Sequence, residues 1–177
     1  WNFGPGLELF RRAYQEFGPL PVVAEDLGTV TPAVRALVSA TGFPGMDVVQ
    51  FYQDDPSVAY VPAPDKMVYS STHDTNTLLG WVREHYGLTE PKGALPDEVK
   101  RLRAEAVAKA DRVMENCLAT DADVAMVTLQ DVMRLDETQR MNVPGTATGN
   151  WSWRADEQAM EDSQQHLRDL AEKSGRI

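Results

Sequence analysis

The chain has 177 residues, of which 42% are hydrophobic and 25% charged, a composition typical of globular proteins and not of disordered or fibrous ones. Its 17 basic and 27 acidic residues give a formal net charge of −10, which disfavours binding to nucleic acids or to anionic membrane surfaces. The single cysteine, Cys117, cannot form an internal disulfide, and we find no secretory signal and no apolar run near the roughly 20 residues of a membrane span. We therefore expect a cytoplasmic protein and, because the sequence begins at Trp1 and not at Met, a processed, engineered or excerpted one.

The N-terminal part predicts a helix, a strand and a second helix. Apolar residues recur every three to four positions over residues 7–17, which indicates an amphipathic helix that Gly18 ends. The apolar run 21–24 indicates a buried strand. A second helix is expected over residues 32–41, with Thr31 as its N-cap.

The rest of the chain repeats this alternation of strand and helix. Each expected strand is a nearly continuous apolar run, which is typical of parallel strands that helices cover. No boundary divides the chain, so we expect an α/β fold in a single segment, residues 1–177. The further strands are expected at residues 46–52, 67–71 and 124–129, and the further helices at residues 78–85, from 96 onward and at about 156–172.

Polar side chains follow every expected strand. The carboxyl ends of parallel strands meet at one edge of a sheet, where the connecting loops carry sites, so we expect two or three carboxylates around one cleft. Each residue could instead be a helix cap or a turn residue. The residues at the strand ends are Glu25, Asp26, Gln50, His73, Asp74, Gln130 and Asp131.

Two of these carboxyl groups are expected to differ in protonation state. Glu25 follows apolar residues, and partial burial would favour its neutral acid form, whereas Asp74 beside His73 is expected to stay ionised. A neutral acid beside a carboxylate is what glycosyl transfer through an oxocarbenium-like transition state requires. We find no phosphate-binding glycine loop, zinc motif or nucleophile elbow, and Cys117 is expected to serve packing.

A series of short motifs links the chain to a known family. They are Ala24–Gly28 (AEDLG), Phe43–Met46 (FPGM), Thr72–Asp74 (THD), Arg140–Thr146 (RMNVPGT) and Gly149–Arg154 (GNWSWR). In order and spacing the series resembles the 4-α-glucanotransferase (amylomaltase, disproportionating enzyme) family. The resemblance implies the C-terminal half, strands five to eight, of a TIM-type (β/α)8 barrel, and it implies neither a metal nor an organic cofactor.

The resemblance also implies roles for single residues. Glu25, at the end of the fifth strand, would be the general acid/base, and Asp74, after the seventh, would hold the sugar ring and stabilise the transition state. We expect the two to converge on one glucose ring. The substrates would be α-1,4-glucans such as maltodextrins or oligosaccharides from starch or glycogen, transferred to an acceptor's 4-hydroxyl by a retaining double displacement. Hydrogen bonds to glucose hydroxyls would come from His73, Asp26, Asp55 and Asn142.

One family feature has no counterpart in the sequence. The nucleophile of the family is an aspartate in an Arg-x-Asp-His motif after the fourth strand, so this chain alone is expected to be inactive. Half a barrel leaves strand edges unpaired, which favours self-association. An α-1,4-glucan hydrolase and a catalytically silent glucan-binding fragment stay open as alternatives. Trp151 is either a stacking platform for a sugar or an ordinary loop anchor.

Overall fold

The computed structural model describes residues 4–177, and in this part of the chain three parallel strands form one sheet. Strands β1 (Gly45–Val48), β2 (Lys66–Tyr69) and β3 (Ala125–Met126) lie in the order β1-β2-β3. Gly45 pairs with Lys66, and Val68 pairs with Ala125. The predicted α/β architecture is confirmed. The described sheet is open, so the barrel stays a prediction.

The helices begin and end close to the positions that the sequence predicts. Local signals explain this agreement, since Thr31, Thr77 and Asp156 each accept a hydrogen bond from a backbone N–H of the first turn that follows. The helices are α1 (Leu7–Phe17), α2 (Pro32–Thr41), α3 (Leu78–His85), α4 (Pro96–Leu118), α5 (Leu129–Val132) and α6 (Glu157–Lys173), with 3-10 turns at Val49–Phe51 and Glu137–Gln139.

The strands are shorter than their apolar runs. The run that contains β1 leaves the sheet after Val48, where the chain turns into the 3-10 helix Val49–Phe51. The run that contains β3 ends early because the Thr128 side chain accepts a hydrogen bond from the Asp131 N–H and so begins α5. Hydrophobic runs therefore mark where each strand lies but not how far it pairs.

The core lies between α3, α4 and the sheet. Helix α4 buries one face, and its Val113 and Cys117 side chains are fully buried against Val68 of β2 and Val82 of α3 in one cluster. Burial raises the pKa of the Cys117 thiol to about 12, so the thiol stays protonated and packs as a small apolar group.

Residues 21–24 do not form the buried strand that the sequence predicts. Val22 and Val23 are exposed, and a single backbone hydrogen bond, from Ala24 N to Pro44 O at 2.8 Å, ties the segment to the start of β1. The next ladder position on β1, the Met46 N–H, donates instead to Asp26 Oδ1 at 2.8 Å. The carboxylate thus takes the place of a strand carbonyl, and the ladder stops after one rung.

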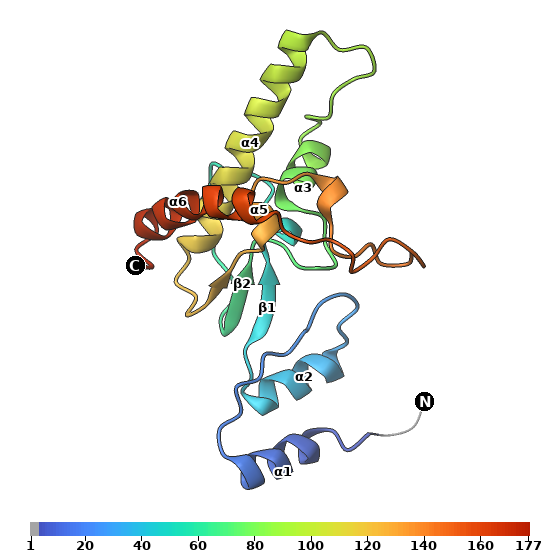
Figure 1. Cartoon of the computed structure of the whole chain (residues 1–177). Coiled ribbons are helices and arrows are strands. Elements are labelled where there is room, and N and C mark those ends of the chain that lie inside the picture. The colour runs from blue at the N-terminus through green and yellow to red at the C-terminus, as the bar shows by residue number, and fades with distance from the viewer. Residues whose placement is uncertain (1–3) are drawn as a thin grey trace.

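The two N-terminal helices stand apart from the rest of the fold. Figure 1 shows α1 and α2 beyond the amino end of β1, while α3, α4 and α6 gather around and beyond the carboxyl ends of the strands. Neither α1 nor α2 contains a buried residue, and Phe17 is 79% exposed. Phe10 packs edge-to-face on Phe43, with 5.5 Å between ring centroids. The apolar stripe of α1 is therefore only partly covered.

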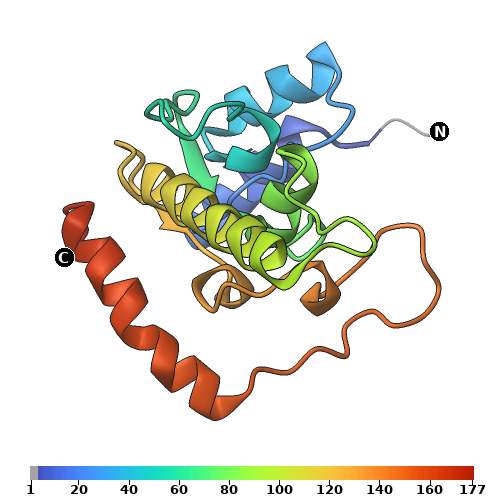
Figure 2. The same ribbon diagram turned by 90° about the horizontal axis from the view of Figure 1, so that it is seen from above.

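The C-terminal part begins with a long loop. Figure 2 shows that the chain swings out between residues 140 and 156 before α6 runs back along the outside of the molecule. Leu170 of α6 is buried, and Lys173 pairs with Glu115 of α4 at 2.6 Å. No helix within residues 4–177 is both long and apolar enough to cross a membrane.

Candidate active site

Three of the predicted site residues meet just beyond the carboxyl end of β2. Asn142 Nδ2 donates to Asp74 Oδ1 at 2.6 Å, and His73 Nε2 lies 3.3 Å from the same oxygen. Asn142 N also donates to His73 O at 3.1 Å, and Arg140 Nη2 donates to Asp74 O at 3.0 Å. The THD and RMN motifs, far apart in the sequence, are therefore in direct contact.

Asp74 is accessible as well as held. Its side chain is 44% exposed, and no hydrogen bond from residues 4–177 reaches its Oδ2 atom. One oxygen is oriented by the Asn142 amide, and the other is left to face a ligand. A carboxylate fixed in this way can accept a hydrogen bond from a sugar hydroxyl or stabilise a nearby positive charge.

Trp151 lies beside this group on the long loop. The residue is 57% exposed, and its ring centroid lies 5.2 Å from that of His73 with a tilt of 38°. Its φ of 61° is in the left-handed region, which costs an ordinary residue free energy, and its N–H donates to Met141 O at 2.8 Å. The ring therefore contacts His73 on one side and is open to solvent elsewhere, which favours the platform interpretation over burial as an anchor.

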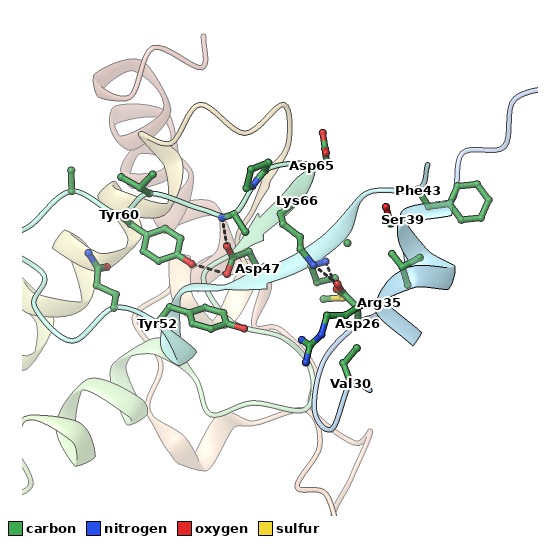
Figure 3. Close-up of a pocket in the computed structure, with 18 of the residues that line it drawn as sticks. Asp26, Val30, Arg35, Ser39, Phe43, Asp47, Tyr52, Tyr60, Asp65 and Lys66 are labelled. Carbon is green, nitrogen blue, oxygen red and sulfur yellow. Dashed lines mark hydrogen bonds and ion pairs between the residues drawn. The ribbon is translucent and has the colours of Figure 1, made fainter. Parts of the chain in front are cut away.

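Asp26 and Asp55 line a large cavity that does not include His73, Asp74 or Asn142. The cavity has a volume of about 870 Å³ and lies between α2, the strands β1 and β2 and the loop that precedes β2 (Figure 3). The Asp26 carboxylate accepts hydrogen bonds from the Lys66 ammonium and from Met46 N. Burial alone would raise the pKa of Asp26, but these contacts outweigh burial, and the pKa is lowered. Hydrogen bonds from Ser57 lower the pKa of the exposed Asp55.

Sequence reasoning missed a buried carboxylate in the wall of the same cavity. Asp47 lies within β1, is buried, and accepts from the Tyr60 hydroxyl at 2.6 Å and from Ala63 N at 2.9 Å (Figure 3). Its contacts fix the loop that precedes β2. A carboxylate in the middle of an apolar run was the available signal for this role.

Glu25 is not brought to Asp74 in this structure. It is exposed rather than partly buried, and its side chain makes no hydrogen bond with residues 4–177. Its neighbours Ala24 and Asp26 bond to Pro44 and Met46 at the amino end of β1, whereas Asp74 follows the carboxyl end of β2. The binding of one glucose ring by both Glu25 and Asp74 therefore stays a prediction.

The remaining strand-end residues turn inward. Gln50 donates to Asn76 O at 2.9 Å, and Gln130 lines a small cavity of about 90 Å³ next to His73. Asp131, which the sequence placed at the cleft, is 3% exposed and accepts three short hydrogen bonds. Its backbone turns into α5 directly after β3, and this turn carries the carboxylate beneath the surface. Among residues 4–177 no group of three His, Cys, Asp or Glu side chains could hold a metal ion.

Comparison with protein families agrees with the motifs. The family model described as 4-alpha-glucanotransferase matches residues 1–159, so the chain belongs to the 4-alpha-glucanotransferase family. The matched residues include both segments that meet at Asp74.

Individual relatives extend this result. The chain is 37% identical over 161 residues to a 4-alpha-glucanotransferase of Streptococcus pneumoniae, covering 89% of the chain and 31% of the relative. It is 38% identical over 163 residues to one of Thermus thermophilus, covering 87% and 32%. Among solved structures, an amylomaltase from Streptococcus agalactiae in complex with acarbose matches with a TM-score of 0.74 and 25% identity, over 99% of the chain and 36% of that protein. The chain thus spans about a third of the length of the relatives that it matches.

Proposed function

We propose that the whole protein is a 4-α-glucanotransferase that moves an α-1,4-glucan chain to the 4-hydroxyl of an acceptor sugar. The observation that carries this proposal is the contact between the THD and RMN motifs, in which Asn142 orients Asp74 beside His73. Family membership supports the reaction class. The relative from Streptococcus agalactiae, in complex with the saccharide-like acarbose, supports a carbohydrate ligand.

In this mechanism Asp74 and its neighbours hold the sugar that reacts. The free oxygen of Asp74 accepts from a ring hydroxyl and faces the positive charge that develops in an oxocarbenium-like transition state. His73 and Asn142 donate to the same or adjacent hydroxyls. The exposed ring of Trp151 offers a flat apolar surface to a neighbouring glucose.

Glu25 supplies the general acid and base in this proposal. For Glu25 to reach the sugar held by Asp74, the segment 21–26 has to pair with β1 as a parallel strand. Its C-terminal end then has to lie beside the carboxyl end of β1. The exposed Val22 and Val23 favour such pairing, which requires the segment to slide along β1 and to give up the present contact of Ala24 N with Pro44 O at the amino end of the strand. Asp26 and Asp55 bind further glucose hydroxyls in this scheme, which requires Asp26 to exchange its Lys66 contact.

The finer architecture belongs to the same proposal. We assign residues 1–177 to a single segment, the C-terminal half of a (β/α)8 barrel, with 21–24 as strand five and β1, β2 and β3 as strands six to eight. The parallel order β1-β2-β3 and the match to an amylomaltase fold support it. The cytoplasmic location, self-association through strand edges and inactivity of the chain alone are predictions of this scheme.

Product analysis tests the proposal. The full-length protein is incubated with maltotriose, with and without excess glucose, and the products are separated. Transfer yields glucose together with longer maltodextrins, and Asp74→Asn abolishes both, while Asp162→Asn on the exposed face of α6 changes neither. Glucose and maltose without longer products show a hydrolase, and glucan binding without turnover shows a silent binding protein; either result contradicts the proposal.

A further inference from the structure

We propose that Asp131 is a positioning residue for glucan transfer, because its buried carboxylate fixes both ends of the segment 72–77 that carries His73 and Asp74. This inference rests on the proposed function. It goes beyond the residues that would touch the sugar, since Asp131 lies beneath them.

The contacts of Asp131 enclose the segment on both sides. On the side of β2, the Ser70 and Ser71 hydroxyls donate to Asp131 Oδ2 at 2.7 and 2.5 Å. On the side of α3, the Leu78 N–H, at the first residue of the helix, donates to Asp131 Oδ1 at 2.7 Å. One carboxylate therefore sets the distance between the end of β2 and the start of α3.

Asp131 is itself held in place. Its N–H donates to Thr128 O at 3.1 Å, and the Thr128 hydroxyl lies 2.9 Å from the Ser71 hydroxyl. With 3% of its surface exposed, Asp131 cannot reach a substrate. Its effect on a bound sugar has to pass through His73 and Asp74.

The energetic cost of Asp131 points to a role beyond stability. No Lys, Arg or His of residues 4–177 forms an ion pair with it, and desolvation raises its pKa although the hydrogen bonds oppose this shift. All its side-chain partners donate, which suits an ionised carboxylate. Burying a carboxylate without a neighbouring cation carries a large desolvation free energy, which an apolar side chain at this position would avoid. Such exceptions are expected where a site needs fixed geometry.

Loss of this anchor should affect turnover more than binding. A displacement of about 1 Å at a catalytic group can lower the rate by about 100-fold. We expect Asp131→Ala to lower kcat about 10- to 100-fold, with a smaller change in KM. Asp131→Asn keeps the shape and one acceptor, so its kcat should lie between those of the wild type and the alanine variant.

The test compares these variants with a variant that only weakens the core. In the full-length protein, kcat and KM for maltotriose disproportionation are measured for wild type, Asp131→Ala, Asp131→Asn and Val113→Ala, at a temperature where thermal unfolding shows each folded. Val113 is fully buried on α4 in the apolar core, which contains no residue of the segment 72–77, and its truncation should leave kcat within about twofold.

The results separate the two proposals. A kcat that falls for Asp131→Asn and Asp131→Ala but not for Val113→Ala supports the inference. If Asp131→Ala does not fold, Asp131→Asn decides by the same criterion. Equal kcat in the Asp131 and Val113 variants of an active enzyme overturns the inference alone, whereas a wild type without transfer overturns the proposed function and with it the inference.

Discussion

At the scale of single residues, the Asp26 carboxylate reports on how the N-terminal segment joins the sheet. It links residues 21–26 to both β1 and β2 through Met46 and Lys66. Gly45 makes room for this contact, since a Cβ atom there would lie 2.6 Å from both carboxylate oxygens. A residue predicted as a sugar ligand is therefore, in this structure, a structural bridge.

The bridge predicts a dependence of stability on pH. The pKa of Asp26 is lower in the folded chain, so its contribution is fully present above the unfolded pKa of about 3.9 and is lost as the pH falls through the folded value. Asp26→Asn should therefore reduce the free energy of unfolding in urea at pH about 7, and the reduction should become smaller as the pH falls below the unfolded pKa of about 3.9. The exposed Asp162→Asn serves as control, with the same small change at every pH. An Asp26→Asn effect that does not decrease as the pH falls contradicts the bridge.

Trp151 predicts a change in substrate binding. If its exposed ring stacks on glucose, Trp151→Ala in the full-length protein should raise KM for maltotriose about two- to tenfold, since aromatic contacts contribute about 0.5–1.5 kcal/mol. Trp151→Phe should restore most of the affinity. Trp153→Phe is the matched control, because the Trp153 indole donates to Gln139 at 3.0 Å and lies among partly buried groups. Unchanged KM in Trp151→Ala would mean that the ring only anchors the loop.

At the scale of elements, local and distant signals were not equally predictable. The bounds of α2 and α3 follow from Thr31, Thr77 and the residues directly after them, so a short stretch of sequence determines them. Residues 21–24 have the apolar character of a strand, but pairing depends on Asp26 and Met46, which are separated along the chain. Strand pairing is thus the step at which sequence reasoning failed.

The candidate site shows the same division. A place for Asn142 and Asp74 at the sugar-binding site was expected from the motif series, and the structure brings the two side chains into direct contact. The burial of Asp131 was not expected, since a carboxylate after a strand looks the same in sequence whether it faces a cleft or the core. Only the turn into α5 distinguishes the two cases.

The C-terminus of α4 yields a prediction at this scale. The Arg176 guanidinium donates to the carbonyl oxygens of Leu118, the last residue of α4, and of Thr120 and Ala122 in the loop that follows, each at 2.8 Å. Arg176→Ala should lower the free energy of unfolding by about 2–3 kcal/mol in urea denaturation. Arg176→Lys should recover little, because an ammonium cannot reach three carbonyls in a planar fork. Full recovery by lysine would show that charge alone matters there.

At the scale of the whole molecule, exposed apolar surface and open strand edges predict association. Tyr14 and Phe17 of α1 and Val22 and Val23 of the following segment are exposed, and β1 is an edge strand of the described sheet. Light scattering of the isolated chain should show species larger than a monomer, and Phe17→Glu combined with Val22→Glu should reduce them. Ile177→Glu, at the exposed C-terminal end, should not. A monomer at all concentrations contradicts this expectation.

In the proposed function Glu25 and Asp74 act together on one sugar, although the described structure holds them apart. A double-mutant cycle on the full-length protein tests it most directly, by kcat/KM for maltotriose in Glu25→Gln, Asp74→Asn and the double variant. Each single change should cost about 10²–10⁴-fold. Because residues that act as a unit are strongly non-additive, the double variant should lose little more than the worse single variant. Losses that multiply as independent factors, or single variants as active as the wild type, contradict the claim.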